Sequence, residues 1–308
     1  ERFGIAHDQG SSHGHTRVIR QAYFEHPDYV PLLVDAYRLW DDLADHSGQP
    51  LISRCGLLLA GVPDGPAVAG TRHAARLHGL DLQDVSRSRL DNDFPGFTIP
   101  DDFDAVWEAA GGFLLVEDAV AAHIARAIEH GAVLHTEETV VRWSRVGKSY
   151  EVVTDRGHYQ AGSLIIAPGS FVPGLLPELD VAWEIVRKPL FWFPARSGLY
   201  DHSRGSGVFF LETSGGEFYG FPSLDGETVK VAEHTAGLEI TDPLTVDRDV
   251  IDRDLPPLIE YLQAHMPGLS TKPTDHTVCL YTRTPDGNFI VDKHPRHDGV
   301  AIGCGFSG

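Results

Sequence analysis

Polar and apolar residues alternate most regularly near the end of the chain, over residues 277–283, which read TVCLYTR. A period of two is typical of a β-strand, and it places Cys279 and Tyr281 on the same face. The Pro-Asp-Gly sequence at 285–287 predicts a turn and residues 288–291 a returning strand, so we predict a β-hairpin here. On this pattern alone, a buried structural thiol is the simpler interpretation of Cys279.

A helical period marks residues 117–131, where apolar residues recur every three or four positions and Gly131 is placed to end the helix. Residues 132–143 then have the pattern of a strand region, and residues 149–161 that of a hairpin. Residues 163–167 have the pattern of a buried strand that ends in Pro-Gly. This order, a βα unit followed by a β-meander, suggests a nucleotide-binding type of domain.

The residue pattern changes over residues 181–271, where short segments rich in aromatic residues and typical of strands follow one another, as in PLFWFPA, GVFFLE and EFYGFP. Such a succession predicts a largely antiparallel sheet and therefore a second domain. A length of 308 residues also suggests about two domains. We therefore predict a two-domain fold of the mixed α/β (α+β) class.

Composition and charge restrict the possible partners. Asp and Glu together number 44 against 25 Lys and Arg, a balance that argues against a surface for nucleic acids or for anionic membranes. No apolar run approaches the length of a transmembrane helix. The three cysteines are odd in number and show no CxxC spacing, so we expect a reducing, cytoplasmic location.

Residues 10–32 concentrate basic side chains beside small ones. Ser12 or Thr16 is placed to cap a helix, on which Arg17 and Arg20 would lie on neighbouring faces. Two guanidinium groups in an acidic protein suggest recognition of a carboxylate or a phosphate, although surface ion pairs at a solvated helix start would explain them equally well.

His13 and His15 stand in the same segment, but no matching carboxylate cluster accompanies them, and we expect no metal site. Farther along, the sequence VKVAEHTAG places Lys230 and His234 on one face of a strand. If that face is buried in a cleft, burial lowers the pKa values of both side chains. An exposed strand face is the alternative.

The last residues, VAIGCGFSG, contain a G-x-G-x-x-G pattern after a strand. A dinucleotide-binding fingerprint would also need a following helix and an acidic residue about 20 positions later, and neither is present. We therefore do not interpret this pattern as the phosphate-binding turn of a nucleotide-binding domain.

Five stretches, taken in order, resemble the monomeric sarcosine oxidase and N-methyltryptophan oxidase family of flavin amine oxidases. They are GSSHG-TR-IR-AY-E---YVPL, YGFPS, K---HT-G, C-YT-T-D--FI-D-HP and the terminal GFSG, and the resemblance extends over nearly the whole chain. It implies a two-domain flavoprotein that binds FAD. It further implies that the cysteine of the C-x-Y segment, here Cys279, is bonded covalently to the flavin, and that Tyr281 helps to form the substrate pocket.

The resemblance also assigns catalytic and substrate-binding roles. Lys230 would lie over the flavin as the cation that activates oxygen, and Arg17 would lie on the opposite side of the flavin. Arg20 would pair with the carboxylate of the substrate. His234 and Tyr219 would line the substrate site, where Phe210 and Phe218 suggest a bulkier lining than a very small amino acid requires.

The remaining residues implied by the resemblance contact the cofactor. Glu1 would hold the ribose hydroxyls of the adenosine, and the backbone of Val140 would meet the adenine. The segment from Gly305 would open a helix whose N-terminus faces the flavin ring and favours the reduced anion. The full set of expected cofactor-binding residues is Glu1, Ser11, Ser12, Thr16, Arg17, Val140, Cys279, Gly305, Ser307 and Gly308.

The chain departs from the family pattern at both ends. The phosphate-binding G-x-G-x-x-G of the family, with its first βαβ elements, precedes the position of Glu1, and a further substrate-binding lysine follows GFSG. Both ends therefore have the appearance of cuts. We expect residues 1–308 alone to hold FAD poorly and to be inactive, because the main pyrophosphate site is not among them.

These observations and the family resemblance lead to one prediction of domains and function. The incomplete, Rossmann-like FAD-binding domain comprises residues 1–50, 109–178 and 279–308, and the substrate domain comprises residues 51–108 and 179–278. The enzyme is expected to be a monomer that oxidises an N-methyl or secondary amino acid to an imine and reduces O2 to H2O2. The alternatives are a flavin dehydrogenase with another electron acceptor, and an inactive remnant of the fold.

Overall fold

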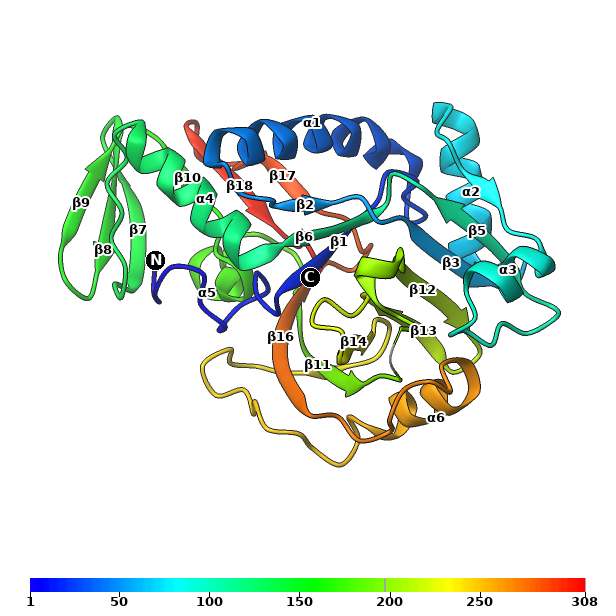
Figure 1. The fold of residues 1–308 in the computed structure, drawn as a ribbon. Helices are drawn as coiled ribbons and strands as arrows, with labels where there is room; N and C mark the ends of the chain where they lie inside the picture. The colour runs from blue at the N-terminus through cyan, green and yellow to red at the C-terminus, as the bar shows by residue number, and fades with distance from the viewer. Residues whose placement is uncertain (197, 308) are drawn as a thin grey trace.

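A computed structural model describes residues 1–196 and 198–307 (Figure 1). Its largest unit is a nine-stranded sheet in the order β15-β11-β14-β13-β12-β3-β5-β4, to which β16 is added by pairing with β11. The strands are β3 (Leu57–Gly61), β4 (Gln83–Asp84), β5 (Asp104–Glu108), β11 (Glu184–Pro194), β12 (Val208–Thr213), β13 (Gly216–Gly220), β14 (Thr228–Glu233), β15 (Leu238–Glu239) and β16 (Asp275–Arg283). Within this sheet β12 and β3 run parallel, and the other pairings are antiparallel. The predicted antiparallel sheet is thus confirmed.

Alternating side chains divide the large sheet into two apolar faces. Phe209 belongs to a core that includes residues of α6 (Pro256–His265), whereas its neighbour Phe210 belongs to a core that includes residues of α2 (Pro66–His78). A period of two forces this division, because successive side chains of a strand point to opposite faces. Cys279 and Tyr219 lie in the second core, together with Phe210.

Three smaller sheets complete the molecule. β1 (Thr16–Ile19) and β2 (Ile52–Ser53) flank β6 (Gly112–Leu115), and α1 (Val30–Ser47) and α4 (Val116–Glu129) lie along this group in Figure 1. The other two sheets and the short helices are β7 (Val140–Val146), β8 (Ser149–Thr154) and β9 (His158–Ala161); β10 (Leu164–Ile166), β18 (Val300–Cys304) and β17 (Ile290–Lys293); α3 (Arg87–Asp93) and α5 (Val172–Leu175); and η1 (Pro27–Tyr29), η2 (Gly169–Phe171) and η3 (His202–Arg204). No helix in the described part of the chain is long and apolar enough to cross a membrane.

The structure confirms the helix predicted for residues 117–131, which is α4, and the meander, which is the sheet β7-β8-β9. The prediction of a buried strand at 163–167 is right about the strand, which is β10, and wrong about its burial. Ile165 is 83% exposed. β10 is an edge strand among the described residues, since it pairs with β18 along one edge and with nothing along the other. Its apolar sequence is typical of a strand covered on both faces of a parallel sheet, but the face that carries Ile165 is exposed.

The helix predicted from Ser12 or Thr16 onward is wrong. Residues 16–19 form strand β1, antiparallel to β6, and Arg17 lies opposite Leu114. Three of the four residues of β1 are β-branched, and β-branched side chains lose less freedom in a strand than in a helix. Arg20 directly follows β1, so the two arginines are held by a strand and its end.

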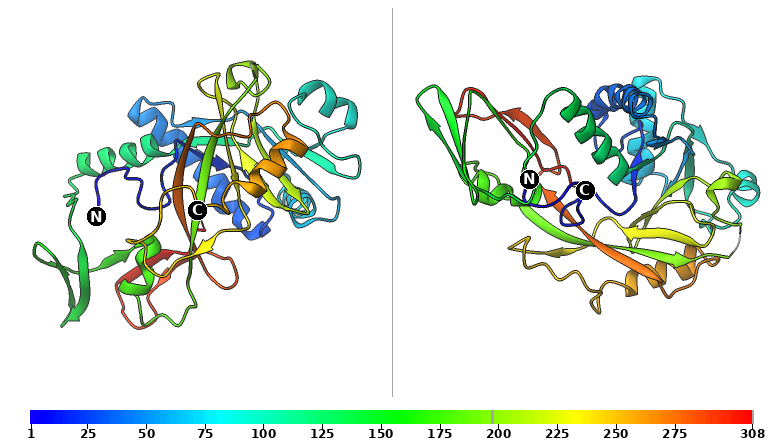
Figure 2. Two further views of the ribbon diagram at one scale, coloured as in Figure 1. Left: turned by 90° about the horizontal axis from the view of Figure 1, so that it is seen from below. Right: turned by 60° about the vertical axis from the view of Figure 1, so that its left-hand side comes forward.

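The predicted hairpin is also wrong, although both of its strands form. β16 pairs with β11 over nine residues, whereas β17 pairs with β18 in another sheet. β11 and β16 lie side by side in both views of Figure 2. The turn at 285–287 is present, with Gly287 at φ 70°, but six residues separate the strands and carry the chain from one sheet to the other. β16 therefore pairs with the long, distant strand β11 and not with the neighbouring strand β17.

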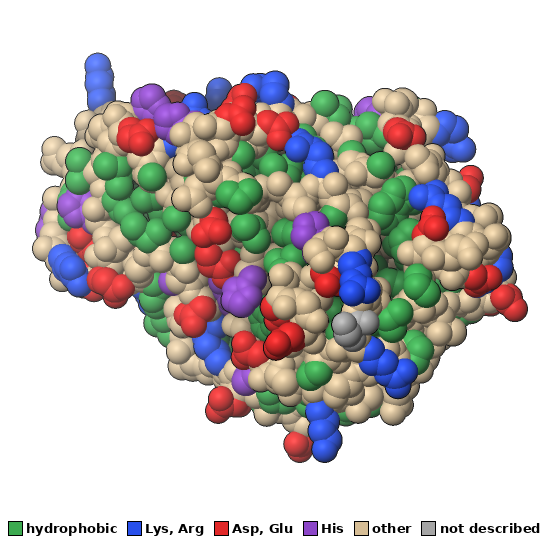
Figure 3. Space-filling model, viewed as in Figure 1, with side chains coloured by type: hydrophobic (Ala, Val, Ile, Leu, Met, Phe, Trp, Pro, Cys, Tyr) green, Lys and Arg blue, Asp and Glu red, His purple; other side chains and the backbone are tan. Residues whose placement is uncertain are grey.

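The proposed division into two domains remains a prediction, and its boundary between residues 278 and 279 falls inside β16. On the face drawn in Figure 3, basic side chains are scattered and many lie beside acidic ones. Hydrophobic side chains gather on this face toward the side where Figure 1 draws α4 and β7.

Candidate active site

Two cavities adjoin between the large sheet and the smaller ones. The larger has a volume of about 1220 Å³ and the smaller a volume of about 540 Å³. Both are lined by Arg17, Trp40, Phe306 and Ser307, so they meet at these side chains. Arg17 therefore stands at the junction of a large site and a small one.

The sequence-predicted residues divide between the two cavities. The larger is lined by Glu1, Ser11, Ser12, Arg17, Val140, Gly305 and Ser307. The smaller is lined by Arg17, Arg20, Tyr219, His234, Tyr281, Ser307 and Phe210. Thr16, Lys230 and Cys279 are buried beside them, Phe218 instead stacks on Tyr261 in the opposite core, and Gly308 lies outside the described residues.

Lys230 is buried where β14 faces the segment that precedes β1. Its Nζ donates hydrogen bonds to the carbonyl oxygens of Gly14 (2.6 Å) and Thr16 (2.8 Å). It also lies 4.1 Å from the centre of the Phe221 ring, a favourable distance for a cation over an aromatic face. Burial lowers the pKa of Lys230 well below its ordinary value, and the charge of Arg17 adds to this effect.

Cys279 lies on β16, and its buried thiol lies near His13, Arg17 and Lys230. Its Sγ is 3.3 Å from Nε2 of His13, a nitrogen that also lies 3.1 Å from the carbonyl oxygen of Gly10. Burial raises the pKa of the thiol, and the neighbouring charges of Arg17 and Lys230 partly oppose that rise. The structure thus brings Lys230, Cys279 and Arg17 together.

Arg17 is fixed by the backbone of the loop before β1. Its guanidinium donates to the carbonyl oxygen of Ser11, and the hydroxyl of Ser11 donates to the carbonyl oxygen of Leu280. The loop is thereby tied to β16 next to Cys279. The contact of His13 with Cys279 escaped sequence reasoning, because residues 10–15 lack a regular period from which a facing could be predicted.

Arg20 points its guanidinium into the smaller cavity. Nη2 donates to both carboxylate oxygens of Glu25, at 2.6 and 2.7 Å, and the guanidinium lies 4.0 and 4.2 Å from the ring centres of Tyr23 and Phe24. Nη1 is buried and has no hydrogen-bond partner among the residues described. A buried N–H without a partner is costly, and an anionic ligand would satisfy it.

Neutral polar groups line the smaller cavity next to Arg20. The hydroxyl of Tyr281 lies 3.4 Å from that of Tyr219 and 3.5 Å from Nδ1 of His234. Burial, followed by the charge of Lys188, lowers the pKa of His234 to about 3. The imidazole is therefore neutral at pH 7, and burial keeps both tyrosines protonated by raising their pKa values.

Lys188 lies next to Tyr281, and Glu233 lies next to His234. Neither residue was predicted from the sequence to belong to the site. Lys188 Nζ lies 3.6 Å from a carboxylate oxygen of Glu233, 3.2 Å from the carbonyl oxygen of Glu233 and 5.3 Å from the ring centre of Tyr281. Glu233 directly precedes His234. The available signal was Lys188 itself, a cation within the largely apolar strand β11.

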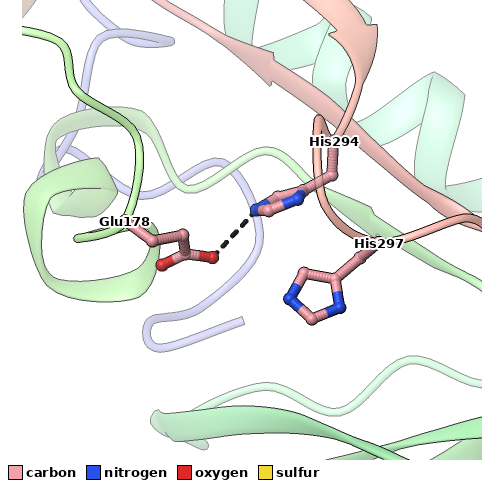
Figure 4. A group of neighbouring side chains, drawn as sticks. All are labelled: Glu178, His294 and His297. Atoms are coloured by element: carbon pink, nitrogen blue, oxygen red, sulfur yellow. Dashed lines mark hydrogen bonds and ion pairs between the residues drawn. The ribbon is translucent and has the colours of Figure 1, made fainter.

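Glu178, His294 and His297 form a group whose possible ligand atoms lie within 4.8 Å of one another (Figure 4). The Nδ1 of His294 accepts the backbone N–H of Arg296 at 3.1 Å, and its Nε2 lies 2.8 Å from Glu178. The network therefore places the proton on Nε2, where it occupies the position that a metal would need. We assign this group a structural role and no metal. His15 is exposed, whereas His13 is buried.

The larger cavity fits a large dinucleotide such as FAD. Its volume exceeds the usual range of about 300–1,000 Å³ for sites of drug-sized molecules. Arg17 supplies a fixed positive charge at its inner end. The hydroxyl of Thr282, which lines it, is buried and has no hydrogen-bond partner in the described part of the chain.

Comparison with known proteins agrees with this geometry. The family model of FAD-dependent oxidoreductases (DAO) matches residues 1–308. Monomeric sarcosine oxidase of Streptomyces avermitilis is 35% identical over 313 residues, which cover 100% of this chain and 81% of the relative. N-methyl-L-tryptophan oxidase of Citrobacter koseri is 31% identical over 306 residues, which cover 98% of this chain and 80% of the relative. The resemblance inferred from the sequence motifs is confirmed.

Solved structures share the fold. NikD, an unusual amino acid oxidase essential for nikkomycin biosynthesis, superposes in its open form with a TM-score of 0.87 at 22% identity, covering 100% of this chain and 82% of its own. Glycine oxidase from Geobacillus kaustophilus has a TM-score of 0.78 at 17% identity, covering 100% and 81%. These likenesses confirm the mixed α/β architecture.

The buried Lys188 predicts an alkaline dependence of stability. Burial lowers its pKa from 10.5 to about 8, so between these pH values the unfolded chain binds more protons than the folded one. The free energy of unfolding should therefore rise with pH across this window, by on the order of 3 kcal/mol over the whole of it, and be independent of this group below it. Lys188→Met should lose that rise in urea unfolding at pH 7.5 and 9.5.

The exposed Lys272→Met serves as the control and should keep the pH dependence of the wild type. Equal slopes for wild type and Lys188→Met would show that Lys188 titrates normally in the folded protein.

Proposed function

Because this chain belongs to the family of FAD-dependent oxidoreductases, we propose that it oxidises an N-methyl or other secondary amino acid to an imine, while O2 is reduced to H2O2. The observation that carries the proposal is the pair of cavities that meet at Arg17. One is large and fits FAD, and the other is lined by neutral His234 and by Arg20, whose buried Nη1 has no hydrogen-bond partner among the described residues. The names of the two relatives, a sarcosine oxidase and an N-methyltryptophan oxidase, support the substrate class.

FAD, when bound, supplies the electron acceptance and the transfer of electrons to oxygen. The protein binds and orients the substrate. In this proposal, Nη1 of Arg20 donates to the substrate carboxylate, which places the amine near Tyr281 and His234. A neutral imidazole and two neutral phenols leave the amine uncharged, the form that can lose a hydride.

Water then hydrolyses the released imine, and an N-methyl substrate yields formaldehyde and the primary amino acid. In the proposal Lys230 is the cation that stabilises negative charge as oxygen is reduced, because its Nζ is held in place by two carbonyl oxygens. Arg17 lies at the junction on the side of the cofactor. The residues that would hold FAD are Glu1, Ser11, Ser12, Thr16, Arg17, Val140, Gly305, Ser307 and Gly308.

We further propose that Cys279 anchors FAD through a thioether. Its buried thiol, next to Arg17, and the C-x-Y motif of the segment support this role. A monomeric state and a cytoplasmic location remain part of the same proposal, and the sarcosine oxidase of Streptomyces avermitilis, a monomeric sarcosine oxidase by name, supports the first of these.

The function is tested by oxygen uptake of the full-length enzyme with sarcosine and N-methyl-L-tryptophan, each of which should release formaldehyde and H2O2. Arg20→Ala should raise KM, because it removes a charge-assisted contact with the substrate in a desolvated pocket. The loss of binding free energy should be about 2–5 kcal/mol. Arg20→Lys should recover only part, because a lysine cannot reproduce the fork. Exposed Arg38→Ala is the control, and an unchanged KM in Arg20→Ala would make Arg20 structural.

The role of Lys230 predicts a selective loss. Lys230→Met should slow reoxidation of the reduced enzyme by oxygen roughly 10²-fold or more, the scale of losing one pre-organised electrostatic group. Reduction by the substrate should fall much less, and stopped-flow absorbance separates the two steps. Exposed Lys148→Met should alter neither. Equal losses in both steps would remove the specific role, and reduction without any reaction with oxygen in the wild type would favour a dehydrogenase.

The tether predicts how the cofactor leaves the denatured protein. Acid precipitation of the wild-type full-length enzyme should carry the flavin absorbance into the pellet, whereas Cys279→Ser should leave it in the supernatant. Cys304→Ser, also a buried thiol but in the sheet β10-β18-β17, is the matched control and should behave like the wild type. Flavin released from the wild type by denaturation would leave Cys279 a core thiol.

A further inference from the structure

Glu217 is a carboxylate in the smaller cavity that the proposed chemistry does not use. It lies on β13 two residues before Tyr219, so both side chains point to the same face of the sheet. Both line the smaller cavity. The backbone of Glu217 is fixed, because its carbonyl oxygen accepts the N–H of His234 at 2.7 Å.

A second carboxylate lies directly across from Glu217 on the neighbouring strand. This residue is Glu212, and like charges in opposite positions of a sheet are destabilising. Glu212 is compensated, since its carboxylate accepts the N–H of Ala67 at 2.8 Å in the first turn of α2. Among the described residues, the carboxylate of Glu217 forms no hydrogen bond and no ion pair.

The cations near Glu217 are engaged elsewhere. Arg20 is paired with Glu25, and Lys188 with Glu233. Arg283 donates to the carbonyl oxygens of His234 and Thr235 and lies 3.7 Å from Glu184. Burial raises the pKa of Glu217, the charges of Glu212, Glu25 and Glu233 raise it further, and Arg20 only partly opposes them. The protein therefore keeps an uncompensated acidic group facing this cavity.

We propose that Glu217 binds a cationic group at the end of the substrate side chain, so that the preferred substrate is a secondary amino acid with a basic side chain. This inference rests on the proposed function and names its substrate class. Arg20 would hold the carboxylate of such a substrate and Glu217 its distal amine or guanidinium. A cavity of about 540 Å³ with Phe210 in its wall gives room for the apolar stem between them.

Selectivity against a neutral side chain follows because such a side chain would leave the Glu217 carboxylate without a hydrogen-bond donor. A charge-assisted hydrogen bond between an ammonium and a carboxylate is among the stronger polar contacts in proteins. A neutral side chain of the same length would displace water from Glu217 without replacing its hydrogen bonds, and sites built for a polar partner reject analogues that lack it.

The experiment compares Nα-methyl-L-lysine with Nα-methyl-L-norleucine, which has a neutral side chain of similar length, on the full-length enzyme. We expect kcat/KM to favour the lysine derivative by roughly ten-fold or more. In Glu217→Gln that ratio should fall at least ten-fold, and in Glu217→Lys Nα-methyl-L-glutamate should become the better substrate. Glu260→Gln, an exposed carboxylate on α6 that lines neither cavity, should keep the wild-type ratio.

A binding measurement separates this inference from the proposed function. Calorimetric titration with 6-aminohexanoate and hexanoate should show tighter binding of the amine-bearing ligand, and Glu217→Gln should abolish the difference. If no N-methyl amino acid is oxidised, the proposed function fails while calorimetry still decides the role of Glu217. Wild type that does not prefer the cationic member of either pair, or a preference that survives in Glu217→Gln, would overturn the inference.

Discussion

The contact on which the site depends is the one between the ammonium of Lys230 and the carbonyl oxygens of Gly14 and Thr16. It joins strand β14 of the large sheet to the segment that leads into β1. Moving an ammonium from water into a core is unfavourable, and two hydrogen bonds to carbonyl oxygens and the face of Phe221 offset only part of that cost, since the pKa of Lys230 stays well below its ordinary value. The same segment carries Arg17, so this contact also places the guanidinium at the junction of the two cavities.

Local charge in this region runs against the charge of the whole molecule. Acidic residues exceed basic ones by 44 to 25, yet Arg17, Arg20, Lys188 and Lys230 gather around the candidate site. Burial and the charges of Lys188, Arg20, Arg283 and Arg17 together hold His234 neutral. An anionic ligand therefore finds a cationic pocket in an acidic protein, which is a local arrangement of strands and loops that net charge could not reveal.

The sequence predicted what depends on local pattern. The alternation at 277–283 correctly placed Cys279 and Tyr281 on one strand, and the helical period correctly located α4. The hairpin was wrong because the partner of β16 is β11, about 90 residues away, and pairing between distant strands leaves no local signal. The contact of Cys279 with His13 also depends on tertiary packing, so the motifs could suggest roles for the residues without giving this contact.

The proposed oxidation needs the substrate amine to lie away from the two carboxylates that line the smaller cavity, Glu25 and Glu217. Hydride loss requires a neutral amine, and a carboxylate beside the amine would favour its protonated form. The carboxylate of Glu217 lies two residues along β13 from Tyr219, whereas the groups that meet around Tyr281 are an imidazole and phenols, all neutral at pH 7. In the proposed binding mode, the strand period lets Glu217 face the cavity two residues away from Tyr219. A cationic side chain of the substrate can then bind to Glu217 while the reacting amine stays among neutral groups and remains unprotonated.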